Sequence, residues 1–355
     1  MTLLDMLDIQ LPIIQAPMAG VSSPAMAAAV SNAGALGSLG LGATDAEGVR
    51  RLFTLFRERS GRSLNVNVFC HQPARPDATL EAAWIEYLRP HFQAFGAQPP
   101  SQLREIYRSF VADDAMLAVL LQERPRVVSF HFGLPSAQRI RALRDAGIIL
   151  LATATNPTEA RLAAAAGVHG LVAQGFEAGG HRGTFDADAP DDCLSTVVLT
   201  RLLVREQRIP VIAAGGIMDG AGIAAVLRLG ASAAQLGTAF IACQESNADA
   251  GYRQALAGDA AHHTVMTRAI SGRPARCLRN AFTALGSNVN PQRIAGYPMA
   301  YDAAKSLNAA AKAAGDSRYG AQWAGQGAMQ SRAGLAAGEL VEVLARELRV
   351  ASRLD

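Results

Sequence analysis

The residues best suited to chemistry follow apolar segments that end in glycine. The segment VAQGFEAGGHRGTF, residues 172–185, passes from a hydrophobic stretch into Gly179 and Gly180 and then into His181. Glycine makes the backbone permissive, and histidine is the side chain whose ordinary pKa lies closest to neutrality. The end of this segment is therefore a candidate site, in which Glu177 and Arg182 have no role that the sequence assigns.

Two glycine motifs suggest a second function, the binding of an anion. Residues 213–217 read AAGGI and residues 235–238 read QLGT, each at the end of an apolar segment. Glycine lets backbone N–H groups approach a phosphate, and a following helix N-terminus adds positive partial charge. The alternative is that these glycines only make tight turns. The candidate residues are Gly215, Gly216, Gln235, Leu236, Gly237 and Thr238.

Amides and small side chains stand at other strand ends. The motif QAPMAG occupies residues 15–20 and includes Ala16, Pro17 and Met18, while Asn67 and Gln174 end two further apolar segments. A flavin edge alternates hydrogen-bond donors and acceptors, which one amide side chain can match. Together with a phosphate site, these residues favour a flavin. Taken singly, each amide could equally be a hydrogen-bonded core residue.

The elements that would position these residues alternate between strand and helix. Helical patterns with Ser, Asp or Asn at the start and Gly at the end separate the apolar segments. Eight such units favour a (β/α)8 TIM barrel over an open sheet, with the active site at the carboxyl ends of the strands. The predicted strands are 12–18, 34–40, 64–70, 126–132, 148–155, 170–176, 209–216 and 233–240.

Two segments interrupt the alternation, and both follow strand ends. We predict a barrel formed by residues 1–75, 115–243 and 319–355, and a smaller, mainly helical lid domain formed by the insertions 76–114 and 244–318. The last part, 331–348, is predicted to be a closing helix. Insertions at this face of a barrel are well placed to cover a substrate.

Composition excludes several classes of protein. The 355 residues carry a net charge of +3 without a long basic run, which argues against nucleic acid as a partner. Cys70, Cys193, Cys243 and Cys277 form no CxxC pair, so we expect no metal site and reduced thiols in a cytoplasmic protein. Residues 9–44 lack charge, but prolines and polar residues break the stretch, so no membrane span is expected.

Five motifs in this order carry a resemblance to a known family. QAPMAG, NVNVFCH, GFEAGGHRG, AAGGI and QLGT resemble the nitronate monooxygenase family, formerly called 2-nitropropane dioxygenases. The resemblance spans essentially the whole chain. Tyr107, His131 and the cluster of Tyr297, Tyr301 and Lys305 fall where the first class of that family has its pocket residues.

The resemblance implies a barrel that binds FMN and oxidises alkyl nitronates with O2 to a carbonyl compound and nitrite. Asn67, Gln174, Gly179, Gly180, Gly215, Gly216 and Gln235 to Thr238 would contact FMN, and Ala16 to Met18 would line the flavin. His181 would be the catalytic histidine, acting either as a base or as a cation. The substrate, such as propionate 3-nitronate, would lie among Tyr107, His131, His181, Tyr297, Tyr301 and Lys305. No NAD(P)H is implied, and the enzyme would be a monomer or homodimer.

The same residues also allow other functions and other roles. The same fold could carry an FMN-dependent NAD(P)H reductase of quinones or enoyl thioesters, or a flavin-free site for a phosphorylated metabolite. His131 could be a core histidine bonded to the backbone. Tyr297, Tyr301 and Lys305, spaced i, i+4 and i+8, are expected on one face of a helix, which could be a solvated face or could suit an anion.

Overall fold

The computed structural model describes residues 1–353 and contains a barrel of eight parallel strands. All eight predicted strands are present, each shorter than its apolar segment because the segments continue into the loops that form the site. The strands are β1 (Ile13–Gln15), β2 (Gly37–Gly40), β3 (Leu64–Phe69), β4 (Val127–His131), β5 (Ile149–Ala154), β6 (Gly170–Gln174), β8 (Val211–Ala214) and β9 (Ala233–Leu236).

The barrel is closed between its first two strands. The sheet runs in the order β1-β9-β8-β6-β5-β4-β3-β2, and Ile14 pairs with Leu36 in a parallel bridge at the seam. The Gln15 N–H donates to the Leu36 carbonyl at 2.9 Å, and the Ser38 N–H donates to the Gln15 side chain at 2.8 Å. The predicted TIM barrel is therefore confirmed.

The predicted helices of the barrel are also present. A side chain caps each N-terminus, as the sequence pattern indicated. The helices and their capping residues are α2 (Pro24–Asn32, Ser23), α3 (Ala46–Arg57, Asp45), α6 (Ala137–Asp145, Ser136), α7 (Pro157–Ala166, Asn156), α8 (Thr196–Glu206, Ser195) and α9 (Gly220–Arg228, Asp219). Also in the barrel are α1 (Leu3–Leu7), α5 (Asp114–Glu123), α10 (Thr238–Ile241) and the closing helix α14 (Ala337–Ala351).

The amino-terminal end of the barrel is filled by apolar side chains. Leu3 and Leu7 of α1 pack in one buried cluster with Ile14, Val127 and Ile212 from the strands. This plug leaves the carboxyl ends of the strands as the open end of the barrel. The candidate motifs all lie there.

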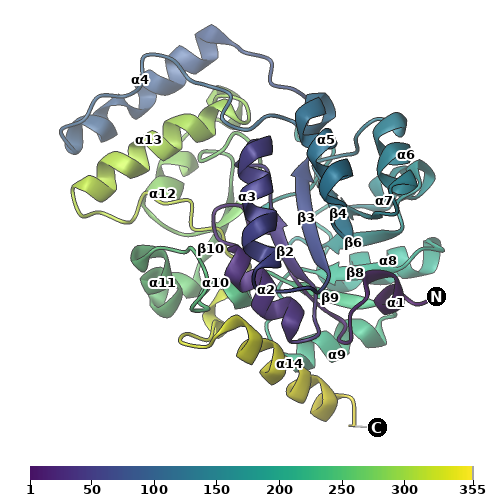
Figure 1. Ribbon diagram of the computed structural model, residues 1–355. Helices are drawn as coiled ribbons and strands as arrows, with labels where there is room; N and C mark the ends of the chain where they lie inside the picture. The colour runs from purple at the N-terminus through teal and green to yellow at the C-terminus, as the bar shows by residue number, and fades with distance from the viewer. Residues whose placement is uncertain (354–355) are drawn as a thin grey trace.

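The two insertions pack against each other on one side of the barrel, where Figure 1 shows α4 beside α13. Trp84 and Phe92 of α4 share a buried cluster with Met299 and Leu307 of α13. The second insertion also contains two strands, β10 and β11, which pair antiparallel with each other, and β11 pairs antiparallel with the short β7 that carries His181. The elements are α4 (Ala78–Ala94), η1 (Phe110–Ala112), α11 (Ala250–Ala257), η2 (Asp259–His262), β7 (Gly180–His181), β10 (Thr264–Thr267), β11 (Ala275–Leu278), α12 (Ala281–Ser287), η3 (Pro291–Arg293), α13 (Met299–Ala313) and, beyond the insertion, η4 (Ala328–Gln330).

Three observations concern membranes, metals and thiols. Within residues 1–353, none of the helices combines the length and the apolar character needed to cross a bilayer. In the same range, no three or more His, Cys, Asp or Glu side chains converge as metal ligands would. All four cysteines are free, and Cys193 alone among them is exposed.

Candidate active site

A cavity of about 1300 Å³, including its opening to solvent, lies at the carboxyl ends of the barrel strands. Most residues predicted to contact a cofactor line it: Ala16, Pro17, Met18, Asn67, Gln174, Gly179, Gly180, Gly215, Gly216, Gln235, Gly237 and Thr238. Leu236 does not line it, because its side chain points into the apolar packing outside the barrel and is 1% exposed.

Glycines form one end of this cavity. Gly215 and Gly216 have φ angles of +126° and +69°, which other residues rarely adopt. At Gly237 a Cβ atom would come to 3.4 Å from the Ala16 side chain. Where the two predicted phosphate motifs meet, no bulky side chains cover the backbone. Its N–H groups can therefore approach an anion.

The two predicted cofactor amides are held by hydrogen bonds. Asn67 donates from Nδ2 to the carbonyl and hydroxyl of Ser129, at 3.0 and 2.9 Å. Gln174 donates to the His181 carbonyl at 3.0 Å and accepts from the Gly183 N–H at 2.8 Å. Gln174 therefore fixes the loop that carries His181 as well as lining the cavity.

Gly179 lines the cavity and also allows close packing of another segment. A Cβ atom at Gly179 would lie 2.4 Å from the Gly325 nitrogen and 2.5 Å from the Ala324 carbonyl carbon. The absence of a side chain thus lets residues 324–325 pack on the loop before His181. The nearest atoms are backbone of the same chain rather than open cavity.

His181 lies in the cavity wall on β7 and is oriented from behind by Ser271. Its Nε2 atom is 2.9 Å from the Ser271 hydroxyl, and that hydroxyl donates to the Arg273 carbonyl at 3.2 Å. In the tautomer with its proton on Nε2, His181 donates to Ser271, which in turn donates to the Arg273 carbonyl. That tautomer leaves Nδ1 unprotonated. Within residues 1–353, Nδ1 makes no hydrogen bond and is available to a ligand.

The surroundings of His181 favour the neutral imidazole. Burial lowers the pKa of His181 well below its ordinary value of 6.5, and His131, Arg273 and His71 lower it further. Arg273 is 6% exposed, and no carboxylate among the described residues lies within ion-pair distance of it. Its guanidinium lies 4.3 Å from the centre of the Phe132 ring, which in turn contacts His181 edge-on at 5.5 Å. A permanent cation therefore stands close behind the histidine.

His131 is hydrogen-bonded as well as lining the cavity. Its Nε2 donates to the His181 carbonyl at 3.2 Å, and its Nδ1 lies 3.0 Å from the Thr153 hydroxyl. Burial lowers the pKa of His131 to about 4. The histidine is thus neutral and both of its nitrogens are engaged, which limits it to shaping the wall.

Aromatic side chains form the wall that faces the barrel. Tyr107 and Tyr301 line the cavity with their rings 5.4 Å apart, and Trp323 lies 5.0 Å from the His181 ring. The Trp323 indole donates to the Tyr301 hydroxyl at 3.2 Å, and the Tyr252 hydroxyl donates to the Trp323 carbonyl. These residues come from both insertions and from the segment after them.

Tyr297 takes a position that the helical spacing did not predict, whereas Tyr301 and Lys305 share one face of α13 as expected. Helix α13 begins at Met299, so Tyr297 lies before it, separated by Pro298, and does not share a helix face with Tyr301. The expectation of one continuous stripe is wrong, because the helix does not extend back through the Tyr297–Pro298 bond. Tyr297 contacts the His181 ring at 5.6 Å from outside the cavity lining. The Lys305 ammonium lies 4.8 Å from the Tyr107 ring and 5.3 Å from the Tyr301 ring, behind the wall.

Several functional candidates escaped the sequence analysis. They are Phe69, Tyr252 and Trp323 in the cavity wall and Ser271 and Arg273 behind His181. Trp323 carried a usable signal, since it is one of two tryptophans in the chain and stands in the glycine-rich stretch AQWAGQG. Ser271 and Arg273 carried none, because only the pairing of β11 with β7 brings them to His181.

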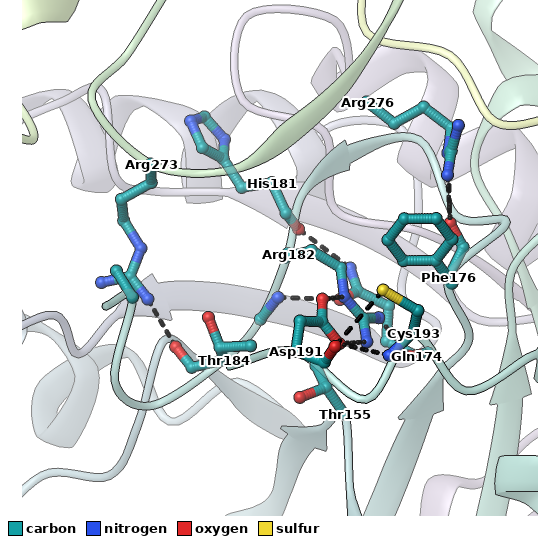
Figure 2. A network of polar contacts seen from close by, with 12 residues as sticks. Thr155, Gln174, Phe176, His181, Arg182, Thr184, Asp191, Cys193, Arg273 and Arg276 are labelled. Atoms are coloured by element: carbon teal, nitrogen blue, oxygen red, sulfur yellow. Dashed lines mark hydrogen bonds and ion pairs between the residues drawn. The ribbon is translucent and has the colours of Figure 1, made fainter. Parts of the chain in front are cut away.

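Glu177 and Arg182, unassigned from the sequence, hold the loop in place. Arg182 is 1% exposed, forms two hydrogen bonds of 2.7 and 2.9 Å to Asp191, and donates to the Gln174 carbonyl at 2.6 Å (Figure 2). Glu177 accepts from the Thr196 N–H and hydroxyl at the start of α8. Both residues stabilise the segment that presents His181.

The sequence comparisons point to one family, and the similar structures include that family and also FabK from Thermotoga maritima, with a TM-score of 0.75 and 29% identity over 98% of this chain and 95% of that chain. A family model described as nitronate monooxygenase matches residues 1–347. A nitronate monooxygenase of Paraburkholderia phytofirmans is 61% identical over 347 residues, covering 98% of this chain and 94% of the relative. A nitronate monooxygenase of Pseudomonas aeruginosa is 52% identical, covering 97% and 98%. The crystal structure of nitroalkane oxidase from Streptomyces ansochromogenes is similar with a TM-score of 0.90 and 43% identity, over 98% of both chains.

Proposed function

The chain belongs to the nitronate monooxygenase family and is an oxidoreductase, and from this premise we propose that it oxidises alkyl nitronates with FMN and O2 to a carbonyl compound and nitrite. The observation that carries the proposal is the position of His181. Its free Nδ1 belongs to a side chain in the cavity wall, and the same cavity is lined by glycines and amides at the barrel strand ends.

The residues of the barrel wall fit FMN. Gly215, Gly216 and the segment Gln235 to Thr238 would hold the phosphate, since this part of the cavity is lined by backbone without bulky side chains. Ala16 to Met18, Asn67 and Gln174 would surround the flavin ring, with Gly179 and Gly180 at its border. Bound FMN would accept electrons from the nitronate and pass them to O2.

The remaining residues would bind and orient the substrate. We place the nitronate between the flavin and His181, beside Tyr107, His131 and Tyr301, with Tyr297 and Lys305 behind that wall. A neutral His181 is suited to take the α-proton of a nitroalkane at Nδ1, because Ser271 already occupies Nε2. The electrostatics thus favour the base over the cation for His181, and Arg273 supplies the positive charge of the site.

We propose propionate 3-nitronate as a substrate, with its detoxification as the biological outcome. Support comes from the charge of the surroundings. Arg273 lies close behind His181, and the Lys305 ammonium stands behind Tyr107 and Tyr301, so the potential at the cavity favours an anion. The four free cysteines support a location in the cytoplasm.

Oxygen uptake by the flavin-loaded protein with preformed propionate 3-nitronate tests this function. We expect O2 consumption and nitrite formation without any nicotinamide. His181→Asn serves as the control variant: unchanged turnover of nitroalkanes by this variant would remove the role of His181 as base. No uptake by the wild-type protein would contradict the proposed function itself.

A further inference from the structure

A second cavity lies outside the barrel wall, next to the first. It has a volume of about 1530 Å³ including its opening, and it is bordered by the loop after β2, the end of β3 and the segment 105–116. Its lining combines the apolar residues Leu41, Ile106, Phe110 and Met116 with charged residues at the exposed surface, namely Glu47, Arg50, Arg51, Glu105 and Arg108. Two of its acidic residues, Asp45 and Asp113, are engaged as helix caps.

Phe69 is the one residue that lines both cavities. It is the last residue of β3 and pairs in register with His131 of β4. On the inner side, its ring lies 6.3 Å from Tyr107 and 6.3 Å from His131. On the outer side stands Gly42, where an added Cβ atom would lie 2.2 Å from two carbon atoms of the Phe69 ring. The Phe69 ring therefore lies between the two cavities.

The packing around Phe69 holds the ring in this position. The Phe132 ring is 5.0 Å from it, and Phe132 itself has a φ angle of +71°, a strained conformation for a bulky residue. Gly42 provides the space for the ring edge, so a side chain at that position would force the ring to move. The close packing of Phe132 and Gly42 against the Phe69 ring therefore fixes the position of that ring.

We infer that Phe69 is a specificity-determining residue that limits the alkyl-chain length of the substrate by closing the active cavity against the outer cavity. The inference rests on the proposed function, since it concerns the substrate end of the same site. A short nitronate ends at the ring of Phe69. A longer alkyl chain would need the space beyond that ring, where apolar side chains would receive it.

Binding of linear carboxylates tests the inference without turnover. These anions resemble nitronates in charge and shape but are not oxidised, so calorimetric titration of the flavin-loaded protein with propionate and octanoate reports chain-length preference alone. In Phe69→Ala we expect the affinity ratio of octanoate to propionate to rise at least tenfold over the wild-type ratio. A ratio equal to that of the wild type would overturn the inference.

Two further variants keep the test decisive. Ile106→Ala enlarges only the outer cavity and should leave the wild-type ratio unchanged; a rise equal to that of Phe69→Ala would overturn the role of Phe69 as partition. If Phe69→Ala does not fold, Phe69→Leu removes part of the ring and should raise the ratio in the same direction.

Catalysis provides the second readout. With preformed 1-nitronates of three and eight carbons, Phe69→Ala should raise kcat/KM for the longer relative to the shorter at least tenfold. If neither nitronate supports oxygen uptake in the wild type, the proposed function fails, while the carboxylate titration still decides whether Phe69 limits chain length.

Discussion

The two walls of the active cavity are built in different ways. The barrel wall consists of strand ends with glycines, small side chains and two amides, held by hydrogen bonds within the parallel sheet or to adjoining loops. The opposite wall consists of large aromatic side chains from the insertions and the segment around Trp323. In the proposed function, the first wall would contact FMN through its backbone, and the second would set the shape and the electrostatic environment of the substrate site.

His181 stands where these walls meet. It follows β6 and the glycine pair Gly179 and Gly180, yet its strand β7 pairs with β11 of the second insertion. The barrel wall reaches it through Gln174, and the insertion fixes its ring through Ser271. In the proposed function, FMN binding and proton transfer would depend on largely different residues, with Gln174 linking them, and substitutions should separate the two.

Replacing His181 by Asn should give the largest loss of activity, and it should leave flavin binding unaffected. Asparagine cannot take the α-proton, so kcat/KM for a neutral nitroalkane should fall about 10²- to 10⁴-fold. Because the barrel wall is untouched, the flavin content should stay at the wild-type level. Steady-state kinetics with nitroethane and the flavin-to-protein absorbance ratio check both parts. Loss of flavin from this variant would contradict the separation of the two walls.

Gly216→Val should show the opposite pattern on the barrel wall. The φ angle of +69° is strained for a β-branched residue, and the new Cβ would lie 3.2 Å from the Glu177 Cβ. We expect FMN affinity to fall at least tenfold, measured by fluorescence titration of the apoprotein. Gly147→Val is the matched control, because Gly147 has a φ angle of +79° in the turn between α6 and β5, away from the cavity. Equal loss of affinity in both variants would show strain rather than a cofactor contact.

Arg273→Met tests the electrostatics behind His181. The nearby guanidinium contributes to lowering the pKa of His181, so its removal should raise that pKa. His181 acts as a base only when it is neutral. With a higher pKa it becomes protonated at a higher pH as the solution is acidified, so activity is lost at a higher pH. We expect the acidic limb of the pH profile for nitroethane, which lies below pH 6.5 in the wild type, to move to higher pH in Arg273→Met.

The pH profiles of kcat/KM for Arg273→Met and Arg273→Lys provide the comparison. Lysine keeps the positive charge and should keep the acidic limb near its wild-type position. If the acidic limb of the pH profile moves equally in both variants, the pKa of His181 depends on the packing of the Arg273 side chain and not on its charge.

Trp323→Phe should give the smallest effect. The variant keeps an aromatic ring near His181 but loses the N–H that donates to Tyr301. A neutral hydrogen bond contributes about 1 kcal/mol, so a rise of about fivefold in KM with little change in kcat is expected. Tyr301→Phe removes the other partner of the bond. The effects of the two single changes on KM, expressed as free energies, are compared with that of the double variant. If the double variant shows the sum of the two single effects, the bond does not couple the two residues.

The barrel wall could be predicted from sequence because its signals are local. The glycines at 215 and 216, the amide at 67 and the helix caps each follow from residues close together in the chain, and the barrel topology then brings the strand ends together. The opposite wall depends on pairing between distant segments. Trp323 bridges to Cys277 of β11, and β11 pairs with β7, contacts for which one sequence gives no pattern.

The spacing of Tyr297, Tyr301 and Lys305 shows the limit of periodicity. A helix starting two residues later places Tyr297 in a turn, where its ring reaches His181 from a different direction. Proline at position 298 was the available signal, since the residue before proline disfavours the helical conformation. The sequence does not show that Arg273 is a buried charge without an ion-pair partner among the described residues, because this depends on the burial of its side chain.

The account depends most on the claim that this one cavity brings FMN and a nitronate together. Anaerobic mixing of the flavin-loaded protein with preformed propionate 3-nitronate, followed by absorbance of the oxidised flavin, measures this directly. We predict rapid bleaching by the nitronate and none by NADH or NADPH. Bleaching by NADH or NADPH, with no response to the nitronate, would contradict the account and favour a reductase on the same barrel.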